Sequence, residues 1–177
     1  MVERGLRLLI DGRSGSGKTE LAGLLGERWP QAQVVHLDDV YPGWDGLDAG
    51  SRHVHEWVLG ERPRWRRWDW AAETTAEWHM LDPARPILVE GCGALSRASR
   101  ALADLGVWVE LDDEHRKVRA LARDGVAYEP HWDRWAAQEE AILAREDPRS
   151  LADVIVDGSS IPALEAAAGT LLARFVR

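Results

Sequence analysis

An eight-residue stretch near the start of the chain has the spacing of a phosphate-binding loop. It reads Gly12-Arg13-Ser14-Gly15-Ser16-Gly17-Lys18-Thr19 and matches the full G-x-x-x-x-G-K-[ST] pattern. Glycines let backbone N–H groups turn inward toward phosphate oxygens, and the start of a following helix adds a partial positive charge. In such a loop Lys18 reaches the β- and γ-phosphates and the Thr19 hydroxyl binds Mg²⁺. The pattern predicts a nucleotide site formed by Gly12, Ser14, Gly15, Ser16, Gly17, Lys18 and Thr19.

Residues on both sides of this loop supply the strand and the helix that it needs. An apolar run at 6–10 precedes the loop, and a helical pattern at 19–28 begins with its last residue. Further strand-like runs lie at 33–37, 87–90, 107–111 and 154–156. Helical patterns lie at 51–60, 94–105, 114–123, 132–145 and 162–175. This alternation predicts an α/β fold, a P-loop NTPase three-layer sandwich with a five-stranded parallel sheet, helices on both faces and a small helical lid.

The chain is short enough for one domain, which we expect over residues 1–177. Residues 42–86 are irregular and rich in tryptophan, and they predict an acceptor-binding insertion packed over the site. Residues 124–131 predict a mobile loop between two helices and, with the preceding helix, a lid at about 116–131.

Composition excludes several classes of partner. The net charge of −8 argues against nucleic acid, and no apolar stretch reaches the length of about 20 residues that a membrane span needs. The chain has one cysteine, Cys92, which fits a reducing cytoplasm and which we expect to be a packed small residue. These features predict a cytoplasmic protein that binds neither nucleic acid nor membranes. The oligomeric state is left open.

Missing motifs narrow the class of P-loop protein. The chain contains no asparagine, and neither Lys18 nor Lys117 is followed by x-Asp, so the guanine-reading motif is missing and ATP is favoured over GTP. The apolar run at 87–90 ends in Glu90, whereas transport and motor ATPases normally end this strand in Asp or Asp-Glu. Of the classes of P-loop protein considered, the small phosphotransferases remain.

Two carboxylates follow the second apolar run. Asp38 and Asp39 would lie near the γ-phosphate, because ligands bind beyond the carboxyl ends of parallel strands. A carboxylate there can take the proton of an attacking hydroxyl, whereas it would repel a phosphate acceptor. The pair predicts a neutral hydroxyl acceptor, with Asp38 as the first candidate for the catalytic base. A base at Asp39, or a role of both carboxylates in holding Mg²⁺-bound water, stays open.

Three arginines share one face of the predicted helix at 114–123, since Arg116, Arg119 and Arg123 are spaced i, i+3 and i+7. The guanidinium fork binds phosphate oxygens in pairs, so these residues are candidates to close over a transferring phosphate. Arg119 and Arg123 are the strongest candidates for catalysis, and Arg119 also for nucleotide binding. The alternative is a solvated basic face paired with the acids at 112–114.

Several tryptophans could form a flat wall for an acceptor. Trp65, Trp68 and Trp70 alternate with charged residues, as on a strand, and Trp44 or Trp68 could face a planar or sugar-like acceptor. Trp132 and Trp135 are spaced i, i+3, and we expect both to pack their helix against the rest of the protein.

Five segments in fixed order resemble the uridine kinase-like family of P-loop nucleoside kinases. They are residues 12–19, Leu37-Asp38-Asp39-Val40-Tyr41, Trp68-Asp69, Val89-Glu90-Gly91 and Ala152-Asp153-Val154-Ile155-Val156. The resemblance spans roughly residues 5–160. It implies transfer of the γ-phosphate of ATP, with Mg²⁺, to a hydroxyl of a small acceptor such as a nucleoside.

The resemblance also implies roles for single residues. Asp38 matches the catalytic base, Glu90 matches the acid that assists Mg²⁺ binding, and the arginines at 116–123 match lid arginines. Tyr41 and the Trp44-Asp45 segment fall where the family contacts the nucleoside. Trp68-Asp69 would face the base or another acceptor group.

Two other functions stay open. The first is an adenylate kinase-like or gluconate kinase-like enzyme on the same scaffold. The second is a nucleotide-binding regulatory protein without an acceptor, in which hydrolysis or occupancy switches a partner.

Overall fold

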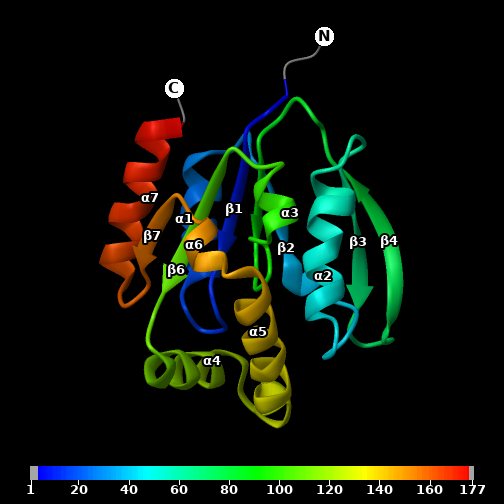
Figure 1. Ribbon diagram of the computed structural model, residues 1–177, viewed down its shortest axis with the longest axis vertical. Coiled ribbons are helices and arrows are strands. Elements are labelled where there is room, and N and C mark those ends of the chain that lie inside the picture. The colour runs from blue at the N-terminus through cyan, green and yellow to red at the C-terminus, as the bar shows by residue number, and fades with distance from the viewer. Residues whose placement is uncertain (1–3, 176–177) are drawn as a thin grey trace.

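A parallel sheet of five strands runs through the computed structural model, which describes residues 4–175 (Figure 1). Its spatial order is β2-β5-β1-β6-β7. The strands are β1 (Arg7–Asp11), β2 (Gln33–His36), β5 (Ile87–Glu90), β6 (Leu105–Glu110) and β7 (Val154–Asp157). The α/β fold with a five-stranded parallel sheet is therefore confirmed.

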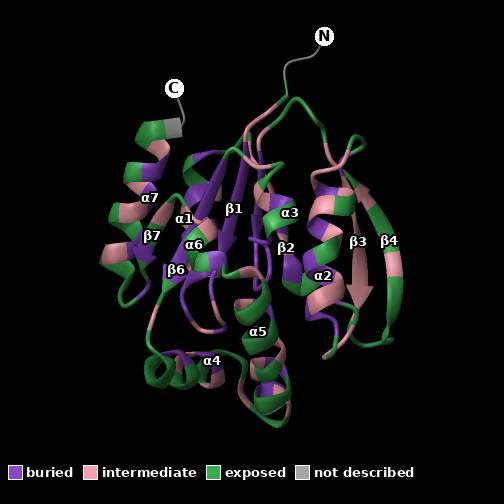
Figure 2. Ribbon diagram, viewed as in Figure 1, coloured by how far each residue is buried: buried purple, intermediate pink, exposed green. Residues whose placement is uncertain are grey.

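Helices cover both faces of this sheet, because its central strands are apolar on both sides. In β1, Leu9 packs toward α2 (Leu47–His53) and α5 (Trp132–Glu146), whereas Leu8 packs toward α1 (Lys18–Arg28) and α7 (Ile161–Phe175). Figure 2 shows the buried residues gathered along these central strands. The carboxyl ends of the strands all point to one edge, where the loops can share a site.

One predicted helix, at 94–105, is wrong in extent. Only α3 (Arg97–Arg100) is helical, and β6 already begins at Leu105. The backbone N–H of Leu95 cannot take part in a helical hydrogen bond, because it donates to the buried carboxylate of Asp11 at 2.8 Å. That carboxylate also accepts from the N–H of Gly12 at 2.7 Å and so ties the end of β1 to this turn.

The predicted loop at 124–131 is also wrong. Helix α4 (Asp113–Tyr128) continues through a kink at Gly125, whose φ is 56°, and a 3₁₀ turn (Glu129–His131) leads into α5. The buried side chains of Tyr128 and Trp132 hold the segment against the core. This packing has a larger effect on the local structure than the turn-forming residues of the segment.

Residues 42–86 contain α2, a π-helical turn (Val54–Val58) and a hairpin of β3 (Arg64–Asp69) with β4 (Thr74–Met80). The hairpin forms its own two-stranded antiparallel sheet beside α2 (Figure 1). A short helix, α6 (Pro148–Leu151), precedes β7. Within residues 4–175 no helix combines the length and the apolar character that crossing a membrane requires.

Candidate active site

The loop at 12–19 has the backbone of a phosphate cradle. Gly15 and Gly17 adopt φ values of 80° and 105°, which side chains with a Cβ rarely adopt. A Cβ at position 15 would also collide with the carbonyl oxygen of Arg116. Helix α1 begins at Lys18, so its free N–H groups face the loop. The local structure therefore fits a bound phosphate chain.

A carboxylate from α5 braces this loop. The Glu139 side chain is 4% exposed, and its Oε1 accepts the Ser14 N–H and the Ser14 hydroxyl, each at 2.8 Å. Its Oε2 accepts from Nε of Arg13 at 3.1 Å. Burial alone would raise the pKa of Glu139, but the Ser14 hydrogen bonds and the charge of Lys18 outweigh it and lower the pKa. No local pattern pointed to Glu139 as a functional residue, because an acid on an amphipathic helix usually faces solvent.

The three arginines of α4 do not share one role. Arg116 is buried and donates from Nη1 to the Ser14 carbonyl oxygen at 3.0 Å, so it backs the loop and also pairs with Asp113. Arg119 donates from Nη1 to the Gly158 carbonyl oxygen at 2.5 Å. Arg123 donates to the Asp124 carboxylate at 2.9 and 2.7 Å.

Two cavities flank the loop. A cavity of about 310 Å³ is lined by Gly15, Glu20 and α4, including Arg119. A second cavity of about 220 Å³ extends from Lys18 and Thr19 toward aromatic side chains. Arg123 lines both cavities and thus stands where a nucleotide on one side would meet an acceptor on the other.

Lys18 and Thr19 lie next to a buried acid. Thr19 Oγ1 lies 3.3 and 3.4 Å from the two carboxylate oxygens of Glu90, which also bonds Nδ1 of His36 at 2.7 Å. Burial opposes the charge of Lys18, but the nearby Cys92, Glu90, Asp38 and Glu139 side chains together outweigh it and raise the pKa of the lysine. A hydroxyl beside a carboxylate fits the oxygen ligands that Mg²⁺ prefers.

Asp39, the other residue predicted to bind metal, is exposed and lies outside the cavity lining. Among residues 4–175 no cluster of three or more His, Cys, Asp or Glu side chains could hold a metal ion by itself. A magnesium ion at Thr19 and Glu90 would therefore depend on phosphate oxygens for further ligands.

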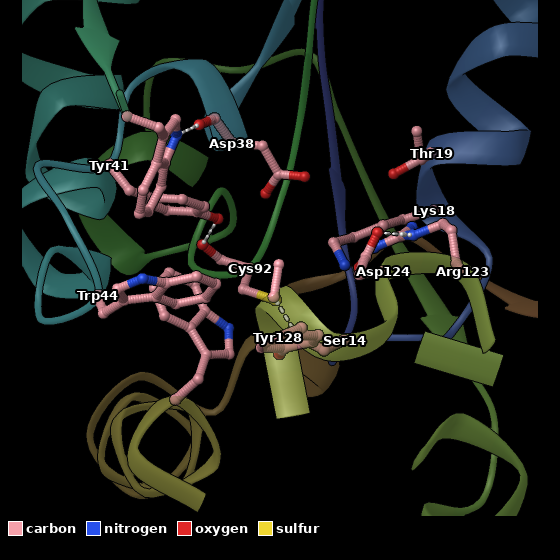
Figure 3. A pocket seen from close by; sticks show the side chains of 13 residues that line it. Ser14, Lys18, Thr19, Asp38, Tyr41, Trp44, Cys92, Arg123, Asp124 and Tyr128 are labelled. Carbon is pink, nitrogen blue, oxygen red and sulfur yellow. Dashed lines mark hydrogen bonds and ion pairs between the residues drawn. The ribbon is translucent and has the colours of Figure 1, made fainter. Parts of the chain in front are cut away.

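Asp38 lies in the second cavity between its two ends. Figure 3 shows its carboxylate pointing into the space between Tyr41 on one side and Thr19 and Lys18 on the other. The side chain is open to the cavity, yet surrounding protein atoms reduce its solvation. Although Asp38 is exposed to the cavity, this loss of solvation, together with the charge of Glu90, raises its pKa, against the opposing effect of Lys18 and Arg123.

Two of the predicted acceptor residues, Tyr41 and Trp44, line the cavity. The Asp45 side chain instead forms an ion pair with Arg134 at the surface. Asp69 accepts the N–H groups of Ala71 and Ala72, each at 3.0 Å, and so shapes the turn of the hairpin. The placement of these two acids gives no support to acceptor binding.

Trp68 is half-buried and does not line the cavity, whereas Trp70 does. Trp70 donates from Nε1 to the Asp38 carbonyl oxygen at 2.8 Å. Tyr128, Trp135 and Cys92 also line the cavity, although Trp135 and Cys92 were expected only to pack. The burial of Trp135 and Cys92 confirms that they pack, and sequence patterns could not reveal that they also line the cavity.

Solved structures share this fold at low sequence identity. A possible uridine kinase from Bacillus stearothermophilus is 20% identical, with a TM-score of 0.58 over 88% of this chain and 90% of that one. A gluconokinase from Sinorhizobium meliloti 1021 is 17% identical, with a TM-score of 0.56 over 97% and 95%. A shikimate kinase from Acinetobacter baumannii is 16% identical, with a TM-score of 0.54 over 98% and 96%. No protein-family model and no curated protein sequence matches the chain.

Proposed function

We propose that this protein transfers the γ-phosphate of ATP to a hydroxyl group of a small molecule in the cytoplasm. The observation that carries the proposal is the position of Asp38, in one cavity with Lys18 and Thr19 and opposite a set of aromatic side chains. The fold shared with structures described as a possible uridine kinase, a gluconokinase and a shikimate kinase supports phosphate transfer in general. It does not select an acceptor.

The residues of the loop fit the phosphates of ATP. The positive-φ glycines turn the backbone into a cradle, Lys18 supplies positive charge, and Arg119 borders the cavity on the nucleotide side. Thr19 and Glu90 would hold Mg²⁺, which neutralises phosphate charge when bound. The remaining cradle residues of this proposal are Gly12, Ser14, Gly15, Ser16 and Gly17.

Asp38 would orient the acceptor hydroxyl and take its proton. A raised pKa makes the carboxylate a better base, and the positive charges of Lys18 and Arg123 oppose that rise. Arg123 would offset the charge that develops between the two cavities. In this proposal residues 42–86 bind the acceptor, and the segment at 116–131 is the lid that excludes water.

The proposal is tested by the transfer of labelled γ-phosphate from ATP to a panel of alcohols, with Asp38→Asn and Asp39→Asn compared. Asp38→Asn should lower kcat by about 10²- to 10⁴-fold, because it removes a general base, while ATP affinity stays near that of the unsubstituted protein. A larger loss in Asp39→Asn would move the base to that residue.

Acceptor-independent turnover would contradict the proposal. If ATP hydrolysis is as fast without any alcohol, and responds instead to a protein partner, the protein is a regulatory nucleotide-binding protein.

A further inference from the structure

The cavity of Asp38 has an aromatic end that is held rigidly. At its centre, Trp44 stacks on His131 with ring centroids 4.2 Å apart and packs against Trp70 at 5.1 Å and Tyr128 at 5.6 Å. Trp135 meets the edge of Tyr41 at 4.8 Å. These contacts join three separate segments of the chain, 41–44, the turn at Trp70 and 128–135, so packing supports the shape of the wall before a ligand arrives.

Three side-chain donors of this wall are already used within the protein. The Tyr41 hydroxyl donates to the Cys92 carbonyl oxygen, and the Tyr128 hydroxyl donates to Oγ of Ser14, each at 2.8 Å. Nε1 of Trp70 is likewise occupied by the Asp38 carbonyl oxygen. Figure 3 shows these bonds. A ligand with many hydroxyl groups would lose bonds to water here without full replacement, which costs about 1–3 kcal/mol for each buried group left unpaired.

Charge in the cavity also selects against anions. Two positive side chains line it: Lys18 at the phosphate end, and Arg123, which donates two bonds to Asp124. Within the described lining no positive side chain lies at the aromatic end, and Asp38 stands at its entrance. A carboxylate or phosphate on the acceptor would therefore be buried without a partner.

We propose that the acceptor is an uncharged alcohol with an aromatic or apolar body and few hydroxyl groups besides the one that receives phosphate. This inference rests on the proposed phosphate transfer. The body packs on Trp44 and Trp70, and the hydroxyl lies at Asp38. Sugar acids, polyols and nucleotides are excluded, so the acceptor differs in chemistry from gluconate and shikimate, which are polyhydroxylated acids.

The hairpin turn delivers Trp70 to this wall. Trp70 directly follows β3, and the Asp69 carboxylate fixes the turn by accepting two backbone N–H groups. Trp70 is 38% exposed, so part of its ring is free to contact a ligand. Trp78 on β4 is 39% exposed but lies outside the cavity, where it packs on Trp57. Trp78 is therefore a matched control for substitutions of Trp70.

The test is calorimetric binding to the full chain with Mg²⁺ and a non-hydrolysable ATP analogue. Tryptophol is the uncharged probe, indole-3-lactate is the related acid, and gluconate, sorbitol and uridine are the polyhydroxylated probes. Tryptophol should bind at least tenfold more tightly than each of the others. Trp70→Ala should weaken tryptophol binding about three- to tenfold, as expected for loss of one aromatic contact. Trp70→Phe should retain most of it, and Trp78→Ala should stay within twofold.

The inference is overturned if an acid or a polyhydroxylated probe binds more tightly than tryptophol, if tryptophol does not bind, or if Trp78→Ala weakens binding as much as Trp70→Ala. A parallel assay of labelled phosphate separates this result from the proposed function. Phosphate transfer to gluconate would keep the function and reject the acceptor class. Trp70-dependent binding of tryptophol without transfer to any alcohol would reject the function and keep the class of ligand.

Discussion

The two ends of the Asp38 cavity are built in opposite ways. The phosphate end comes from one continuous segment, residues 12–19, whose backbone and lysine would provide the binding groups in the proposed enzyme. The aromatic end is assembled from Tyr41, Trp44, Trp70 and the region around Tyr128, which the fold brings together from distant positions. A continuous site can be identified from spacing, whereas an assembled site depends on tertiary packing. In the proposed enzyme, the phosphate end would carry out the transfer and the aromatic end would select the acceptor.

The largest effect should come from removing the lysine of the phosphate end. Lys18→Ala should reduce phosphate transfer about 10³-fold or more, because it removes a buried charge from the site of the transferring group. The chain has two lysines, and the second, Lys117, is exposed on α4, so Lys117→Ala is the matched control. Steady-state kinetics should show an unchanged rate for the control. Equal losses in both variants would mean that general charge, and not the loop, drives the reaction.

A smaller effect should follow when the link between the two ends is weakened. Ser14 accepts a bond from Tyr128 and donates one to Glu139, so both ends meet at one hydroxyl. Glu139→Gln should lower the free energy of unfolding by about 1–3 kcal/mol, because one amide oxygen replaces a charged acceptor of four bonds, from Arg13, Ser14 (two) and Cys92. It should also weaken binding of ATP and of the acceptor together.

The control for this variant is Glu140→Gln on the same helix. Glu140 bonds the same arginine, Arg13, at 2.8 Å, but its side chain is exposed. Urea denaturation should place this variant within about 0.5 kcal/mol of the unsubstituted protein. If Glu139→Gln changed ATP binding but left acceptor binding untouched, the two ends would be independent.

The smallest effect concerns a histidine that touches the phosphate end from β2. The hydrogen bond to Glu90 raises the pKa of His36 above its ordinary 6.5. The charged form therefore stabilises the fold fully below pH 6.5, and this stabilisation is lost as the pH rises through the pKa of the folded state. Because His36 is partly exposed, solvent screening keeps the contribution below about 1 kcal/mol.

Urea denaturation at pH 6 and at pH 8.5 measures this contribution. The decrease in stability between the two values should shrink in His36→Gln and persist in His79→Gln. His79 is a suitable control because it contacts Glu77 on the hairpin with the same exposed side-chain fraction, 41%. A decrease that is unchanged in His36→Gln would show that the Glu90 contact does not influence stability.

Sequence patterns predicted the strands and the phosphate end because both depend on local requirements. Apolar runs specify strands buried on both faces, and phosphate binding needs glycine and lysine at fixed intervals. Asp38 could be placed because it follows a strand whose carboxyl end must lie at the shared edge of the sheet. Its role as a base stays a prediction.

The aromatic end could not be predicted to the same extent. Alternation around 65–70 suggested a strand, but β3 has a register shift between Arg66 and Trp68, so the pattern did not show that Trp70 rather than Trp68 reaches the cavity. Glu139 could be placed on a helix but not against the loop that it braces. In each case the missing information is which distant segment the side chain meets.

The separate β3–β4 hairpin has a consequence for how such a protein can change. Its strands pair only with each other in the described structure, and Arg64 stacks over Trp78 of β4 at 4.7 Å and over Trp57 of the π-helical turn at 4.6 Å. It places one side chain, Trp70, in the cavity. If the proposed acceptor site is right, we expect that exchanging the hairpin between α2 and β5 would change the choice of acceptor and leave the phosphate end unchanged.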